Sequence, residues 1–464
     1  MLRILAIALL TLAGTTGLAA TPLPDTPAGK AAGEWIAAVN SGDRALLQAF
    51  RERYERKAPI EGLLELRENT GGFDVVRIER SEPQSISLLV AEREGDGLAR
   101  LDASLEPGKP ASLKLGVELI DRPADLAIPR LDAEGAARAL DMRIDALAAA
   151  DRFSGRVLVV RDGETAFERN VGLADRAAGT PVVADTRFRI GSMNKMFTAV
   201  AILQFVDAGK LNLDTRVGEV LTDYPNRDVA DKVRIRHLLT HTGGTGDIFG
   251  PEFDDHRLEL KTHADYLRLY GKRGLDFDPG SQQRYSNYGF VLLGAVIEKL
   301  SGTSYYEHVK AKVFIPAGMR DTASPTETEV EPRRAKGYMR QGEAWVSNAD
   351  TLPWRGTAAG GGLSTSGDLA RFAAALMDGR LLSKRLFEQA TMAQAPEGGY
   401  GFGFGVAGNG PLRRFGHGGG APGMNGELIV VPRAGTIIVA LSNLDPPVAS
   451  QLASYYANRM PIER

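Results

Sequence analysis

The sequence predicts an α+β fold: an antiparallel sheet flanked by helices with a helical subdomain, preceded by a small α+β N-terminal domain. Strand-like pairs stand at both ends of residues 132–464 with mainly helical patterns between them, so the two ends can share one sheet. Four further strand-like runs lie before residue 120, behind a helical pattern. The 464 residues are 43% hydrophobic and 25% charged, which is ordinary globular composition.

The first twenty residues have the order of a secretory signal peptide. Arg3 precedes an apolar stretch from residue 4 to about residue 12, and small residues lead to Ala19 and Ala20. This stretch is shorter than the roughly 20 residues that span a bilayer. We therefore expect residues 1–20 to be a signal peptide, with a retained anchor as the alternative. We accordingly expect a periplasmic or secreted protein whose mature chain has no membrane span.

Residues 24–120 are predicted to form the small N-terminal domain. A helical pattern covers about residues 30–54, with apolar side chains such as Trp35 and Val39 at mostly helical intervals. The runs FDVVRIERSE, QSISLLVAER, GLARLDASLE and ASLKLGVELI follow, separated by turns. A helix before an antiparallel sheet predicts a cystatin-like arrangement. It holds no cluster of reactive side chains, so its role is open between structure and protein docking.

Residues 121–131 read as a linker, and residues 132–464 as the second domain. The linker has two prolines, mixed charge and no period. A helix is expected over about residues 133–151, followed by two strands around the turn at Asp162 and Gly163. A second strand pair turns at residues 432–435, and a last helix covers about residues 448–460.

The first candidate catalytic element is a serine and a lysine three residues apart at the start of an apolar helix. Ser192 and Lys195 then share one helix face, about one turn apart. The lysine can reach the serine hydroxyl, either as a base or as a cation that lowers the pKa of a neighbouring base. The helix N-terminus adds positive potential for an oxyanion. The simpler interpretation is a serine N-cap, but a first-turn lysine opposes the helix dipole.

The second element is Tyr285-Ser286-Asn287, directly before another apolar helix. Tyr285 would serve as a general base if nearby cations lower its pKa towards neutrality. Asn287 can hold the lysine and a substrate amide oxygen. By itself the string also suits a turn and helix cap.

The third element is His417-Gly418-Gly419-Gly420, expected just before the C-terminal strand pair. Glycines allow close approach of the backbone to a substrate, and an exposed amide here can donate to an oxyanion. Alone, the string would suit a flexible glycine loop with an incidental histidine.

Together the three elements resemble one known site, that of the serine β-lactamase superfamily. The similar branch contains class C β-lactamases, Tyr-type D-alanyl-D-alanine carboxypeptidases and related esterases, with a β-lactamase/penicillin-binding-protein-like fold. The resemblance covers about residue 131 to the C-terminus. Further strings of this type are FRIGSMNKMFTA, LDTRV, VRIRHLLTHTGG, FDPGSQQRYSNYGF, IPAGMRDT, GGGLSTSGDLARF and YGFGF.

The resemblance implies acyl transfer through a covalent acyl-enzyme, without a metal or other cofactor. It implies that Ser192 is the acylated nucleophile and Lys195 its proton partner. Tyr285 would be the base that serves acylation and later activates water, and Asn287 the substrate-orienting amide.

The same resemblance places the histidine string on the substrate side. His417 stands where the family carries Lys, His or Trp, Gly419 is that motif's glycine, and the amides of Ser192 and Gly420 would form the oxyanion hole. Class C β-lactamases usually have Lys-Thr-Gly where this chain has His-Gly-Gly. The missing lysine favours a peptidase or esterase over an efficient β-lactamase.

Other classes of function are disfavoured by composition and spacing. Lys and Arg total 56 against 58 Asp and Glu, so no basic excess suits nucleic acid, and the absence of cysteine removes thiolate chemistry. His237 and His241 have zincin spacing, but Leu238 replaces the required Glu. Two G-x-G-x-x-G strings, one beginning at Gly403, lack the strand–helix context of a dinucleotide site. The remaining histidines, including His263, are expected at the surface.

The sequence therefore predicts an exported serine hydrolase whose partner is a small-molecule or peptide substrate. The bond cleaved is an ester or a D-amino-acid-containing amide. The alternative is a non-catalytic protein on the same fold that binds peptidoglycan or another ligand. The presence of Ser192, Lys195 and Tyr285 together favours the enzyme.

Overall fold

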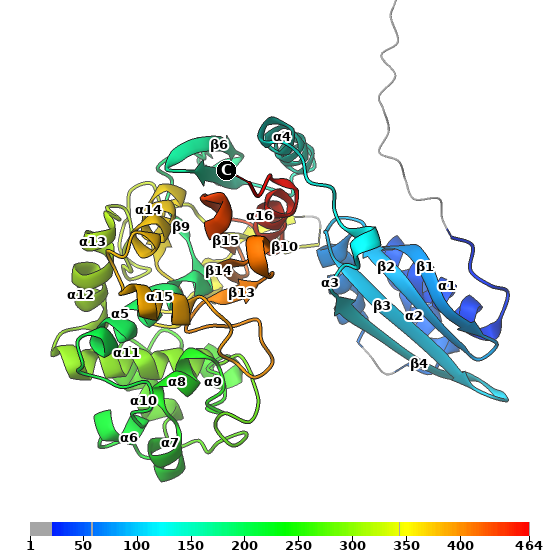
Figure 1. The fold of residues 1–464 in the computed structure, drawn as a ribbon. Helices are drawn as coiled ribbons and strands as arrows, with labels where there is room; N and C mark the ends of the chain where they lie inside the picture. The colour runs from blue at the N-terminus through cyan, green and yellow to red at the C-terminus, as the bar shows by residue number, and fades with distance from the viewer. Residues whose placement is uncertain (1–20, 57–58, 343, 464) are drawn as a thin grey trace, which may run out of the picture. The chain divides into compact units, whose positions relative to one another are not determined.

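A computed structural model describes residues 21–56, 59–342 and 344–463. The chain divides into two compact units between Ala127 and Ile128, and each is described by itself (Figure 1). The expected signal peptide, residues 1–20, lies outside the described residues.

The first unit consists of three helices and one antiparallel sheet. The helices are α1 (Pro27–Ser41), α2 (Arg44–Arg53) and α3 (Ile60–Thr70). The strands β1 (Phe73–Glu82), β2 (Ser85–Glu92), β3 (Leu98–Glu106) and β4 (Lys109–Ile120) pair in chain order. Trp35 of α1 stacks on Phe73 of β1 with ring centroids 5.9 Å apart, so the helices cover one face of the sheet.

The single helix expected over residues 30–54 is two helices. Gly42 ends α1 in the left-handed conformation, with φ of 65°, and the Asp43 side chain caps α2 by accepting from the amides of Ala45 and Leu46. Helical spacing continues through the break, which is why the apolar pattern alone did not show it. A short 3-10 turn, Ala124–Leu126, follows the sheet.

The second unit is built around a six-stranded antiparallel sheet with the order β13-β14-β15-β16-β5-β6. The hairpin β5 (Gly155–Arg161) and β6 (Glu164–Val171) lies early in the chain. It pairs through β5 with β16 (Thr436–Ser442), so the two ends of the unit share one sheet, as expected. The remaining strands are β13 (Gly405–Ala407), β14 (Arg414–Ala421) and β15 (Met424–Val431).

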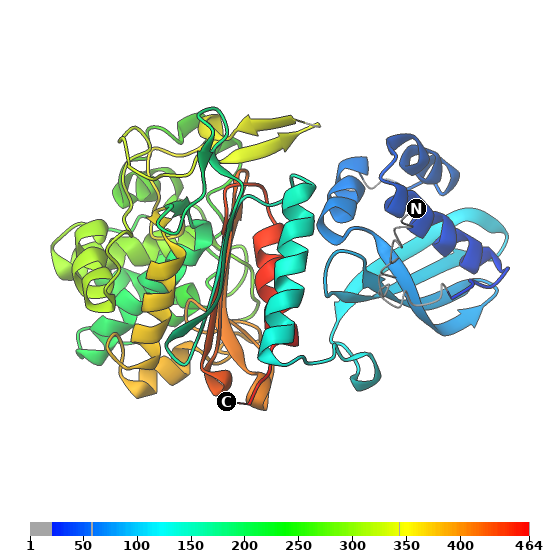
Figure 2. The ribbon, with the colours of Figure 1, turned by 90° about the horizontal axis from the view of Figure 1, so that it is seen from above.

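Helices cover both faces of this sheet (Figure 2). On one face α4 (Ala133–Ala149) and α16 (Val448–Arg459) pack on alternate side chains of β5, β15 and β16. On the other, α5 (Asn194–Asp207) and α14 (Ser366–Met377) pack beside the helical subdomain. Its helices are α6 (Val217–Val220), α7 (Arg227–Lys232), α8 (Ile235–Leu239), α9 (Pro251–His256), α10 (His263–Tyr270), α11 (Asn287–Ser301), α12 (Tyr305–Val309) and α13 (Ile315–Ala317), with a π turn at Lys310–Phe314.

Short elements complete the unit. Two-stranded pieces join β7 (Leu173–Asp175) to β8 (Thr180–Pro181), β9 (Phe188–Arg189) to β12 (Leu363–Ser364), and β10 (Tyr338–Gln341) to β11 (Ala344–Ser347). Helix α15 (Lys384–Ala390) precedes β13. Within the described part of the chain, no helix combines the length and apolar character that a membrane crossing requires.

Candidate active site

Ser192 and Lys195 lie together at the start of the buried helix α5. Ser192 belongs to a 3-10 turn, Gly191–Met193, that runs directly into the helix. The Lys195 Nζ atom lies 3.1 Å from Ser192 Oγ, so the three-residue spacing brings the two groups into hydrogen-bond contact. Helix α5 is apolar on nearly every side, and this places its first-turn lysine inside the protein.

The Lys195 ammonium group is fully buried and held by three oxygen atoms. Besides Ser192 Oγ, it donates to Asn287 Oδ1 at 2.7 Å and to the carbonyl of Ala359. Burial lowers the pKa of Lys195 to about 7, and the charge of Asp247 opposes this effect. Near neutral pH a large share of Lys195 is therefore a free amine that can accept a proton.

Asn287 is fixed by an aspartate that the sequence analysis did not find. Asp247 accepts from the Asn287 backbone amide at 3.2 Å and from Asn287 Nδ2 at 3.1 Å. Because Nδ2 donates to a carboxylate, Asn287 Oδ1 must face Lys195. Asp247 lies in the loop after α8, where the string GGTGD has no spacing that relates it to α11.

Tyr285 contacts Ser192, but its electrostatic environment differs from the expectation. Desolvation of the phenol raises the pKa of Tyr285 above its usual value, against the lowering effect of the Ser192 hydroxyl, although 42% of the residue's surface is exposed. Lys195 Nζ lies over the aromatic ring, 4.7 Å from the centroid. The expectation that nearby cations lower this pKa is wrong for this structure, since desolvation dominates and the charge of Asp247 adds to it, so Tyr285 is a neutral phenol.

His241, considered above only as a zinc ligand and rejected, lies in this site. Its ring centroid is 4.2 Å from that of Tyr285 and 4.7 Å from that of Tyr400. The amide of Ser286 donates to His241 Nδ1 at 3.1 Å, so His241 Nε2 carries the proton. His241 also adopts φ of 59°, an uncommon value for a non-glycine residue. His241 therefore holds the Tyr285 segment in place through its ring contact with Tyr285 and its hydrogen bond with the Ser286 amide.

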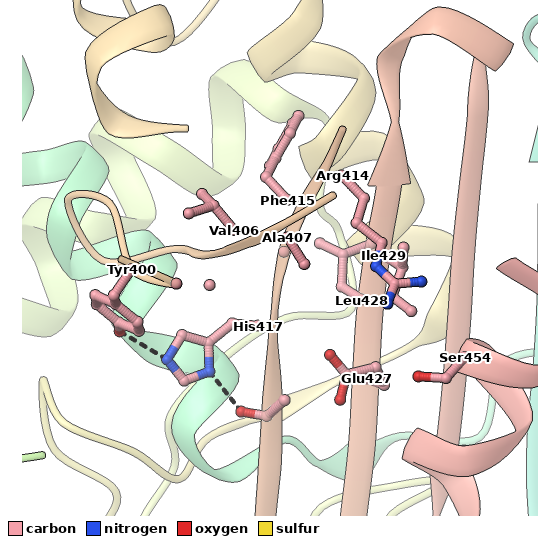
Figure 3. Close-up of a pocket in the computed structure, with 14 residues that line it drawn as sticks. Tyr400, Val406, Ala407, Arg414, Phe415, His417, Glu427, Leu428, Ile429 and Ser454 are labelled. Carbon is pink, nitrogen blue, oxygen red and sulfur yellow. Dashed lines mark hydrogen bonds between the residues drawn. The ribbon is translucent and has the colours of Figure 1, made fainter. Parts of the chain in front are cut away.

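His417 lies on a strand rather than in a loop before the strand pair. It is a residue of β14, and its Nε2 is 2.8 Å from the Tyr400 hydroxyl while its Nδ1 is 2.5 Å from the carbonyl of Gly418 (Figure 3). A carbonyl only accepts, so Nδ1 donates to it and Nε2 accepts from Tyr400. Burial, reinforced by Lys195, lowers the pKa of His417 to about 4. At neutral pH it is uncharged, with both nitrogens engaged inside the protein.

Gly419 and Gly420 bring the edge of β14 against the turn that holds Ser192. A Cβ atom at Gly419 would lie 2.0 Å from the Ile190 carbonyl, and one at Gly191 would lie 3.2 Å from the Gly420 amide nitrogen. Gly420 pairs with Asn425, one step from the Ala421–Met424 pair that closes a two-residue turn. In this register the Gly420 N–H points away from β15. The Gly420 N–H is therefore available to a substrate oxygen, beside the amide of Ser192, which as a first-turn amide has no partner within its helix.

The other histidines do not form a metal site. Across the described ranges, no three His, Asp or Glu side chains gather as metal ligands would. His263 is buried, not exposed as expected. Its Nδ1 lies 3.0 Å from Glu298 Oε1, and its Nε2 accepts from the Ala358 amide at 3.2 Å. The half-buried carboxylate of Glu298 thus fixes this ring, and the polar sequence around His263 gave no sign of that partner.

Acyl transfer needs an activated nucleophile and donors for the developing oxyanion, and the surroundings of Ser192 can supply both. This chemistry defines the class of serine hydrolases that act through an acyl-enzyme. The Beta-lactamase family model matches residues 140–459, and the chain belongs to this family.

Three similar proteins illustrate the range of the family. Penicillin-binding protein 4* of Bacillus subtilis is 30% identical over 63% of this chain and 68% of its own length. Esterase EstB of Burkholderia gladioli is 38% identical over 41% of this chain and 52% of the esterase. The structure of a D-stereospecific amidohydrolase from Streptomyces sp. matches 70% of this chain and 98% of its own with a TM-score of 0.58 and 28% identity. The protein is a serine hydrolase related to these enzymes.

Proposed function

We propose that this protein is an exported hydrolase that cleaves an ester or a D-amino-acid-containing amide with Ser192, Lys195 and Tyr285. The observation that carries the proposal is the contact of 3.1 Å between Lys195 Nζ and Ser192 Oγ, at a lysine whose pKa burial lowers to about 7. A lysine that is neutral near physiological pH is a competent general base for the adjacent hydroxyl.

The proposed acylation step follows from these contacts. Neutral Lys195 takes the proton of Ser192 as Oγ attacks the substrate carbonyl, and the amides of Ser192 and Gly420 donate to the oxyanion. The tetrahedral intermediate collapses when the leaving group takes a proton from the neutral Tyr285 hydroxyl, which Lys195 then reprotonates. Water repeats the sequence on the acyl-enzyme. Asn287, fixed by Asp247, keeps the Lys195 amino group in place throughout.

The environment of His417 supports the proposed substrate class. An uncharged histidine with both nitrogens engaged leaves the His417 position without a fixed cation for a substrate carboxylate. This supports an ester or amide substrate over a β-lactam, in keeping with the relatives named as an esterase and a D-stereospecific amidohydrolase.

The test is intact-mass spectrometry after exposure to a fluorophosphonate, on the wild type and on Ser192→Ala. We expect a single adduct on the wild type and none on the variant. Hydrolysis of p-nitrophenyl butyrate should be lost in parallel. A folded wild type that forms no adduct would instead favour the ligand-binding alternative.

Export is proposed from the sequence of residues 1–20. The experiment is fractionation of a bacterial host that expresses the full chain, with the mass of the mature protein. Recovery outside the cytoplasm with the N-terminus after Ala20 supports export. A full-length cytoplasmic product would contradict it.

A further inference from the structure

A cavity of about 360 Å³ extends around the edge of β14 beside the candidate active site. Tyr400 and His417 line it on the side of that site. Arg414 of β14, Glu427 of β15 and Ser454 of α16 line it on the other side of the strand (Figure 3). The cavity lining thus combines His417, which belongs to the candidate site, with a carboxylate from the neighbouring strand β15.

A glycine allows the Glu427 carboxylate to lie close to the backbone of β14. Gly418 is paired with Glu427, and a Cβ atom at Gly418 would lie 2.6 Å from Glu427 Oε2. The carboxylate therefore lies directly against the backbone of Gly418. On its other edge β14 pairs with β13 only as far as Gly416, so within the described residues no strand covers the edge at Gly418.

Glu427 has little compensation for its charge. Burial raises the pKa of Glu427 to about 7, against the effects of a Ser450 hydrogen bond and the charge of Arg414. The Arg414 guanidinium donates to Asn458 Oδ1 at 2.9 Å. A partly buried carboxyl group in such a setting gains most from a ligand that brings a positive charge and N–H donors.

A substrate that lies along the open edge of β14 would pass this carboxylate. An added strand sends alternate substituents to opposite faces of the sheet. Gly420, the proposed oxyanion donor, and Gly418 are two residues apart, which is roughly 7 Å along a strand. A substituent at that distance from the reacting carbonyl can therefore turn towards Glu427 while the carbonyl stays at Ser192.

We propose that Glu427 forms a subsite for a primary ammonium group of the substrate, located about two strand residues from the reacting carbonyl. The inference rests on the proposed function, because it takes the substrate to be acylated at Ser192. It narrows the substrate class to esters or amides that carry an amine on a chain of about six atoms.

The kinetic test compares two esters that differ only in this group. The wild-type protein, Glu427→Gln and the control Glu388→Gln, an exposed residue of α15, are assayed with p-nitrophenyl 6-aminohexanoate and p-nitrophenyl heptanoate. The wild type should prefer the amino ester. The ratio of the two kcat/KM values should fall roughly tenfold or more in Glu427→Gln, the loss of one charged hydrogen bond, and stay unchanged in Glu388→Gln. An unchanged ratio in a Glu427→Gln protein with wild-type thermal stability would overturn the proposal.

A binding measurement tests the subsite without turnover. 6-Aminohexanamide is titrated calorimetrically into Ser192→Ala and into Ser192→Ala/Glu427→Gln. We expect affinity at least tenfold weaker for the double variant, and equal affinities or no binding to either protein would refute the subsite. If the wild type cleaved neither ester while binding still depended on Glu427, the hydrolase proposal would fail and the subsite would stand.

Discussion

Replacing Asp247 by asparagine tests the electrostatic design of the proposed site. The carboxylate raises the pKa of Lys195 against the lowering effect of burial, so its removal should lower this pKa further. Asparagine can still accept from the Asn287 backbone amide. It offers no charged acceptor to Asn287 Nδ2, which now donates at 3.1 Å. Losing one hydrogen bond to a charged group costs about 1.5–3 kcal/mol, so kcat/KM should fall roughly 10- to 150-fold.

The assay is kcat/KM for p-nitrophenyl butyrate as a function of pH. In the wild type Lys195 must be neutral to accept a proton, so activity should rise with pH through about 7. In Asp247→Asn the rise should move to lower pH while the plateau drops. Asp255→Asn, an exposed acidic residue of α9, is the control and should match the wild type. An Asp247→Asn profile that superimposes on the wild type would refute the assignment of Lys195 as the titrating base.

Three further predictions concern the same machinery. Lys195→Ala should reduce the rate of acylation by a fluorophosphonate by about 10²–10⁴-fold, whereas Lys210→Ala, at an exposed position, should not; retained acylation would exclude Lys195 from the proton path. Gly419→Ala should lower kcat roughly 100-fold because its Cβ would meet the Ile190 carbonyl at 2.0 Å and displace the Gly420 donor, while Gly274→Ala, which has open space, should be silent. Nitrocefin should be cleaved much more slowly than p-nitrophenyl butyrate, and rapid nitrocefin turnover would contradict the interpretation of His417.

Elements with a strong local pattern could be predicted from the sequence. The hairpin at Asp162 and Gly163 and the strand pair that turns at residues 432–435 both lie where the pattern placed them. The break at Gly42 was missed because helical spacing of apolar residues continues across it. The strand that carries His417 was missed as well, because four of its eight residues are glycines, which have low strand propensity. Its place in the sheet comes from pairing with β15.

The residues of the candidate site also fall into two groups, those that local spacing predicts and those that only the tertiary fold brings together. Ser192 and Lys195 are neighbours on one helix, so their contact follows from spacing. Asp247 and His241 reach the site only because the loop after α8 folds against the start of α11, a contact between segments about 40 residues apart. Nothing in either segment alone specifies that contact.

The direction of the Tyr285 pKa shows what a motif cannot specify. The motif predicts a tyrosine near a lysine, and the two are indeed close, but the effect of the charge depends on which atoms meet. Lys195 Nζ lies over the face of the Tyr285 ring and donates hydrogen bonds to Ser192, Asn287 and Ala359. With the phenol desolvated and the Lys195 nitrogen over its ring face, the proton stays on Tyr285. The lysine, whose own pKa burial lowers, is the group that we propose accepts the proton, which is one of the two roles that its position beside Ser192 allowed.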